Sequence, residues 1–131
     1  MQGGLDLDLM PQSLAVCRLQ PNDGIPTWIQ KSDFFSVTRS NDELSIVCTD
    51  VGIPDSVRSE KGWRCLKVKG PLDFSLTGVL ASLVTPLSTA KVSIFTISTF
   101  DTDYLLIKNN DLENARLTLS NAGHRIDDSK K

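Results

Sequence analysis

The chain has 131 residues, 40% of them hydrophobic and 23% charged, enough to bury the core of one ordinary domain or of two very small ones. Its net charge of −2 gives no electrostatic case for binding nucleic acid, which usually requires a basic face. No apolar run approaches the ~20 residues of a membrane span, and the acidic N-terminus lacks the pattern of a signal peptide. We therefore expect a cytoplasmic protein that binds neither nucleic acid nor membrane.

The first third of the chain is predicted to begin loosely and then form a strand. Residues 1–11 are expected to be a flexible lead-in that ends at Pro11. Residues 14–19 are rich in strand formers and are stopped by a Pro-Asn-Asp-Gly turn cluster. Residues 25–29 are compatible with one short helical turn, because Pro26 lies early, where its missing N–H does no harm.

A hairpin, a connection and a further strand are predicted next. Residues 34–38 and 44–48 are apolar runs on either side of a polar corner, which is typical of a hairpin. Residues 51–62 combine glycine, proline and charge and indicate a connection or a poorly formed helix. Residues 63–69 are expected to form a strand that ends at a Gly-Pro pair.

The clearest periodic signal follows. Apolar residues from Leu76 to Leu87 recur at offsets of 0, 3, 4, 7, 8 and 11, the pattern of an amphipathic helix. Asp73 or Ser75 is the candidate cap of this helix, and Pro86 is expected to bend its last turn.

The last third is predicted to be a hairpin and a second helix. The hairpin strands cover residues 91–98 and 103–108. The helix covers 112–122, with Asp111 as its cap and Gly123 as its stop. A short strand near residues 124–126 is compatible with the pattern, and residues 127–131 are expected to be a flexible tail.

The two halves resemble each other at an offset of 60 residues. Each would run strand, helix, hairpin, helix or connection, and strand, with a shortened helix in the first half. This is the βαββαβ order of an α+β protein with an antiparallel sheet backed by helices, and it divides the chain at residues 12–62 and 63–126. The matched positions are Pro26 with Pro86, Lys31 with Lys91, Phe35 with Phe95, and Val37 with Ile97.

The polar corner of the second hairpin is the candidate functional site. Ser98, Thr99 and Asp103 place hydroxyls and a carboxylate at a bend between two apolar runs. Free N–H groups at the start of the preceding helix favour an anion, and Gly78 lets a ligand or a second backbone approach that helix closely. A carboxylate opposite an amide cluster is a zwitterion site, which suits an amino acid. A plain hairpin turn explains the same residues locally.

The three cysteines, Cys17, Cys48 and Cys65, are widely spaced among apolar residues and form no CxxC pair. We expect reduced thiols buried in strands. A catalytic thiol is the sharper alternative, but the single histidine, His124, lies near the C-terminus without a local constellation of partners. No cofactor and no metal is implied.

Residues 72–107 closely resemble the ACT-domain proteins, specifically the small tandem-ACT proteins related to the CASTOR-type arginine sensors. The motifs are Thr-Gly-Val at the helix start and Ser-Thr-Phe-x-x-Asp at the corner, and the resemblance is strong over residues 63–123. It implies two ferredoxin-like ACT repeats, a homodimer, and a non-catalytic sensor of an amino acid. The ligand-binding residues it implies, together with the corner serine, are Gly78, Val79, Ser98, Thr99, Phe100 and Asp103.

Two other functions stay open at this point. One is a structural dimerisation module whose corner is only a turn. The other is an enzyme in which Asp101 and Asp103 hold a metal. Such a site would need a third ligand, and the neighbouring sequence does not supply one.

Overall fold

The computed structural model describes residues 4–70 and 78–128, and the chain divides into two compact units. The first unit is Gln12–Trp63, and the second is Met1–Pro11 together with Arg64–Lys131. Strand β5 (Arg58–Val68) passes from the first unit into the second, so its two ends pair with different strands.

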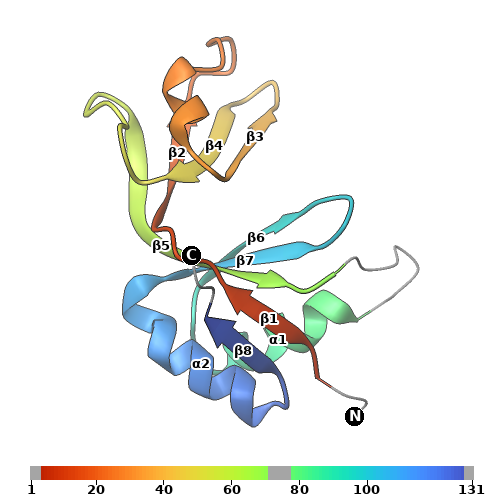
Figure 1. Ribbon diagram of the computed structural model, residues 1–131. Helices are drawn as coiled ribbons and strands as arrows, with labels where there is room; N and C mark the ends of the chain where they lie inside the picture. Colours follow the sequence, from red (N-terminus) through yellow and green to blue (C-terminus); the bar gives the residue numbers. More distant parts are fainter. Residues whose placement is uncertain (1–3, 71–77, 129–131) are drawn as a thin grey trace. The chain divides into compact units, whose positions relative to one another are not determined.

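The first unit is a four-stranded antiparallel sheet with the spatial order β3-β4-β2-β5. Its other strands are β2 (Leu14–Leu19), β3 (Phe35–Arg39) and β4 (Leu44–Thr49). β2 lies between β4 and β5 (Figure 1), so the first strand of the unit pairs with the third and the fourth. That is the strand order of a ferredoxin-like fold, and the expected hairpin is confirmed.

Helices are reduced in the first unit. The expected helical turn is the 3-10 helix η1 (Thr27–Lys31), which packs Ile29 against strand residues of the core. No second helix occurs between β4 and β5, where residues 50–57 are loop and turn. β5 also begins at Arg58, so the prediction of a connection up to residue 62 was wrong by five residues.

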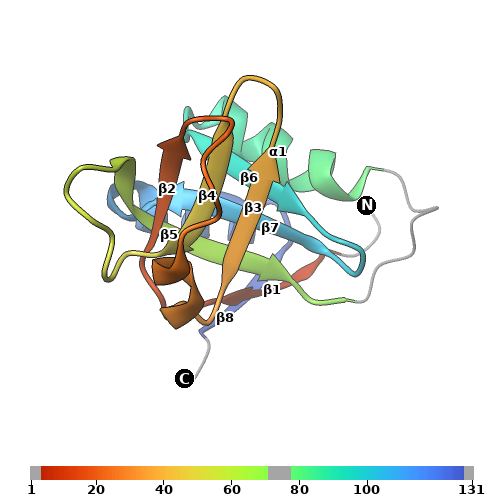
Figure 2. The ribbon, with the colours of Figure 1, turned by 90° about the horizontal axis from the view of Figure 1, so that it is seen from above.

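The second unit has two helices over a five-stranded sheet of order β6-β7-β5-β1-β8. The helices, α1 and α2, and strands β6 and β7 follow β5 in the chain, and both helices pack on the same sheet face (Figures 1 and 2). One core joins helix residues such as Leu83 and Leu119 to strand residues such as Leu66 and Ile107. The bounds are β1 (Asp6–Leu9), α1 (Val79–Thr89), β6 (Ile94–Ser98), β7 (Asp103–Lys108), η2 (Asn109–Asp111), α2 (Leu112–Asn121) and β8 (Arg125–Asp128).

The N-terminal segment corrects the sequence-based expectation. β1 pairs antiparallel with β5 and parallel with β8, so it lies between them in the sheet. Leu7 and Leu9 enter the core, with 0% and 5% of their surfaces exposed. The prediction of a flexible lead-in is therefore wrong for Asp6–Leu9, and that of a tail is wrong for Asp127 and Asp128, which belong to β8.

Both predicted helices are present. In α1, Leu83 and Leu87 are fully buried and Pro86 lies inside the helix, in agreement with the periodic pattern. The expected start at Leu76 and the caps Asp73 and Ser75 lie outside the described residues, and Gly78 occupies the N-cap position. Asp111 is the N-cap residue of α2, but its side chain makes no capping hydrogen bond.

The predicted fold class is confirmed: the protein is α+β and built from ferredoxin-like repeats. Within residues 4–70 and 78–128, no helix is long and apolar enough to cross a membrane.

Candidate ligand-binding site

The polar corner joins β6 and β7 in the second unit. The two strands pair in register from Ile94 with Ile107 to Ser98 with Asp103, so the corner consists of the four residues between them. Leu105 and Ile107 of β7 are fully buried in the core under the helices. The hairpin is therefore fixed by packing, and its polar end projects from a rigid support.

Hydrogen bonds within the corner bring two predicted site residues together. The Ser98 hydroxyl donates to Oδ1 of Asp103 at 2.5 Å. The N–H and the hydroxyl of Thr99 both donate to the carbonyl of Thr102, at 2.8 and 3.1 Å. Because a carboxylate accepts about four hydrogen bonds, the Ser98 bond orients Asp103 and leaves it further acceptor capacity.

A third residue, Thr102, anchors the corner. Its hydroxyl donates to the carbonyl of Val68 at the end of β5, at 2.6 Å, and the residue is only 4% exposed. Thr102 was not among the predicted site residues. The bond spans 34 positions in the chain, so no local pattern distinguishes this threonine from Thr99.

The remaining predicted residues lie at the surface of the same unit. Phe100 is 79% exposed at the tip of the corner. Gly78 has a φ of 78°, a left-handed conformation that favours glycine, and its carbonyl accepts the N–H of Ser82 to close the first turn of α1. The N–H groups of the first turn, beginning with that of Val79, have no acceptor within the helix.

The corner and the start of α1 lie toward the same end of the second unit in both views (Figures 1 and 2). One element presents a carboxylate and hydroxyls, and the other presents backbone donors at the positive end of a helix dipole. The bonds described above join the corner to Val68 and to itself. That Asp103 faces the start of α1 therefore stays a prediction.

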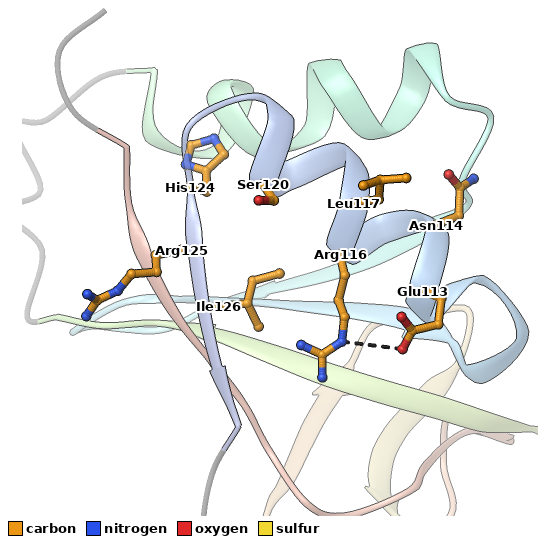
Figure 3. Close-up of a pocket in the computed structure, with 8 residues that line it drawn as sticks. All are labelled: Glu113, Asn114, Arg116, Leu117, Ser120, His124, Arg125 and Ile126. Atoms are coloured by element: carbon orange, nitrogen blue, oxygen red, sulfur yellow. Dashed lines mark ion pairs between the residues drawn. The ribbon is translucent and has the colours of Figure 1, made fainter.

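A separate hollow of about 640 Å³ lies between α2 and β8 (Figure 3). Arg116 pairs there with Glu113 at 3.5 Å and with Asp128 at 2.7 Å. Leu117 is 63% exposed on α2 beside it. None of the corner residues lines this hollow, whose lining is Glu113, Asn114, Arg116, Leu117, Ser120, His124, Arg125 and Ile126.

His124 is a structural residue at the edge of that hollow. Its Nδ1 accepts the N–H of Leu5 at 3.0 Å, and its Nε2 lies 3.1 Å from the carbonyl of Ser82. Nε2 must then carry the proton and donate to Ser82, which fixes the neutral tautomer. His124, which has no partner residue nearby in the sequence, thus joins the N-terminal segment to α1.

Ion pairs connect the edge of the sheet. Lys69 Nζ contacts Asp127 at 2.8 Å and Asp8 at 3.5 Å. The Lys69 hydrogen bond lowers the pKa of the Asp127 carboxyl, and the same bond raises the pKa of the Lys69 ammonium. Both groups are exposed, so these pairs contribute little to stability.

The cysteines are confirmed as free and buried. Burial raises the pKa of the Cys65 thiol to about 12, since the thiolate would lose its hydration. Cys17 and Cys48 lie on neighbouring strands, and a hydrogen bond between them lowers the pKa of Cys17 and raises that of Cys48. Among residues 4–70 and 78–128, no three His, Cys, Asp or Glu side chains are grouped to hold a metal, so Asp101 and Asp103 gain no third ligand.

The fold defines the class of protein as a small α+β protein built from ferredoxin-like repeats. The family model of the ACT domain matches residues 58–121, and a second family model, of an N-terminal domain, matches residues 12–56. Residues 58–121 therefore match the ACT domain, and the chain is an ACT-like protein related to the CASTOR-type proteins.

Three known proteins are similar to this chain. Protein Atu0741 from Agrobacterium tumefaciens is 42% identical, with a TM-score of 0.92 over 98% of this chain and 96% of that chain. Human CASTOR3P is 30% identical over an alignment of 100 positions, which covers 66% of this chain and 61% of the curated relative. The regulatory subunit of aspartate kinase from Thermus thermophilus shares the fold at 13% identity, with a TM-score of 0.60 over 91% of this chain and 95% of that chain.

Proposed function

We propose that this protein is a non-catalytic sensor that binds an amino acid between the β6–β7 corner and the start of α1. The observation that carries the proposal is the oriented Asp103 carboxylate on a corner anchored to β5 through Thr102. The reduced, buried cysteines are in keeping with action in the cytoplasm.

The two ends of an amino acid would meet complementary groups. Asp103 would accept hydrogen bonds from the α-ammonium group, with the Thr99 hydroxyl beside it. The N–H groups of Gly78 and Val79 would donate to the α-carboxylate, which the helix dipole also favours. Phe100 would then lie against the ligand side chain. Charge-assisted bonds of this kind are roughly twice as strong as neutral ones, so a small ligand could be held by few contacts.

A homodimer would complete the site. This chain spans 61% of the length of the curated relative it matches. A second copy related by a two-fold axis would supply a second pair of repeats. Binding would then shift the equilibrium between free and assembled chains. Sedimentation with and without amino acids tests this step. The same sedimenting mass in both conditions would contradict it.

The second candidate is a dimerisation module without a ligand. The Ser98–Asp103 bond favours it, because that bond already gives the carboxylate a partner within the turn. This candidate predicts a stable oligomer that is insensitive to every amino acid.

Binding is tested by thermal unfolding of the full chain with each of the twenty amino acids. A true ligand at a hundredfold excess over its Kd should stabilise the protein by about 2.7 kcal/mol. Asp103→Asn should remove that stabilisation, whereas Asp101→Asn, which neutralises the neighbouring exposed acid, should keep it. If no amino acid stabilises the chain, or both variants behave like the parent, the proposed site is wrong.

A further inference from the structure

Two arginines lie directly opposite each other in the first unit. Arg18 of β2 pairs with Arg58 of β5 in the antiparallel register, so their side chains project from the same face of the sheet. Opposed residues of an antiparallel pair have Cβ atoms roughly 5 Å apart, and like charges in such positions destabilise the sheet. A negative charge close to both guanidinium groups would therefore stabilise this arrangement.

Arg18 makes hydrogen bonds within the chain, whereas Arg58 is exposed to solvent. Nη2 of Arg18 donates to the carbonyl of Asp42 at 2.9 Å, and Nη1 lies 3.5 Å from the carbonyl of Leu19. These contacts orient the guanidinium and engage two of its five N–H groups without neutralising its charge. Arg58 is exposed, and the described parts of the chain provide no ion-pair partner for it.

Both arginines line the same two hollows. The larger, of about 360 Å³, adds the polar residues Gln20, Asp23 and Ser56. The Asp23 carboxylate there accepts the N–H of Gln20 at 3.0 Å. The smaller hollow, of about 220 Å³, adds Glu43 and Glu60. The larger hollow thus offers two guanidinium groups against one acid that is already hydrogen-bonded, within the size range of small-molecule sites.

We propose that Arg18 and Arg58 bind the phosphate or carboxylate group of a small anionic ligand in the larger hollow. Paired guanidinium forks match the oxygens of such a group, and the ligand would remove the repulsion between the arginines. Glu43, Glu60 and Asp23 surround the pair and would repel an extended polyanion, so the ligand is a small molecule and not a nucleic acid. This site lies in the first unit and is independent of the corner in the second.

The test is a calorimetric titration of the full chain at low ionic strength with inorganic phosphate and, separately, with succinate. We expect saturable binding of at least one of them, weakened about tenfold or more in Arg58→Gln and less in Arg58→Lys. Lys31→Gln, which removes an exposed charge elsewhere in the same unit, should bind like the parent. Binding of phosphate alone or of succinate alone identifies the anionic group. Binding of neither, or equal binding by parent and Arg58→Gln, overturns the proposal.

Unfolding at low salt gives an independent readout. Arg58→Gln removes the repulsion between the two arginines, so the unfolding midpoint of this variant without added anion should be no lower than that of the parent. The bound anion should raise the midpoint of the parent and leave that of Arg58→Gln almost unchanged. An equal rise in both proteins would show that the anion acts elsewhere and would contradict the assignment.

Discussion

Thr102 shows at the scale of one residue how the corner is held. Its hydroxyl is the buried donor to the Val68 carbonyl, where β5 ends. Thr102→Val keeps the shape of the side chain but leaves that carbonyl without this partner. Because an unsatisfied buried polar group costs about 1–3 kcal/mol, we expect the free energy of unfolding in urea to fall by that amount.

Thr96→Val is the matched control for Thr102→Val. Thr96 is exposed on β6 of the same hairpin, where valine is as good a strand former as threonine. Its free energy of unfolding should change by less than about 0.5 kcal/mol. An equal loss in the two variants would mean that the Val68 bond does not anchor the corner.

At the same scale, the sequence indicated the corner but not its anchor. Ser98 and Asp103 could be selected because they lie close together in the chain and carry a hydroxyl and a carboxylate. Thr102 and His124 could not, since their partners are residues 34, 42 and 119 positions away. Arg18 and Arg58 were missed for the same reason, as their opposition depends on the register of β2 and β5.

At the scale of elements, the start of β1 depends on a close approach of two backbone segments. A Cβ atom added at Gly4 would overlap the backbone carbonyl of Gly123, beyond the end of α2. We expect Gly4→Ala to lower the free energy of unfolding by about 1–3 kcal/mol, because backbone atoms must shift to admit the methyl group. Gly24→Ala is the control, since an added Cβ there meets nothing within 4 Å. Equal stability of the two variants would show that the N-terminus moves aside without cost.

The sequence predicted elements well where their pattern was long or local. The helices repeat their apolar residues over three turns, and both hairpins join strands that are adjacent in the chain. β1 has only four residues, Asp-Leu-Asp-Leu, and its partners are β5 and β8, far along the chain. Its alternation of exposed and buried residues was too short to stand out from a loop.

At the scale of the whole molecule, the N-terminal strand is part of the main core. Leu7 is fully buried with residues of both helices and of β7. We expect Leu7→Ala to cost about 2–5 kcal/mol in denaturant unfolding, the range for a cavity in a packed core. Leu117→Ala, at a leucine that is 63% exposed, should cost far less. A small effect of Leu7→Ala would mean that β1 is dispensable.

The position of β1 has a consequence for biosynthesis. β1 is made before both of its partners: it can pair antiparallel with β5 first, but its parallel pairing of Asp6 with Arg125 must wait until β8 has been made. Residues 12–63 can meanwhile pair among themselves. Closing such a long loop is entropically costly and slows folding. The nascent chain therefore carries one unpaired edge of β1 until β8 has been made, and a chaperone would act on it in this interval.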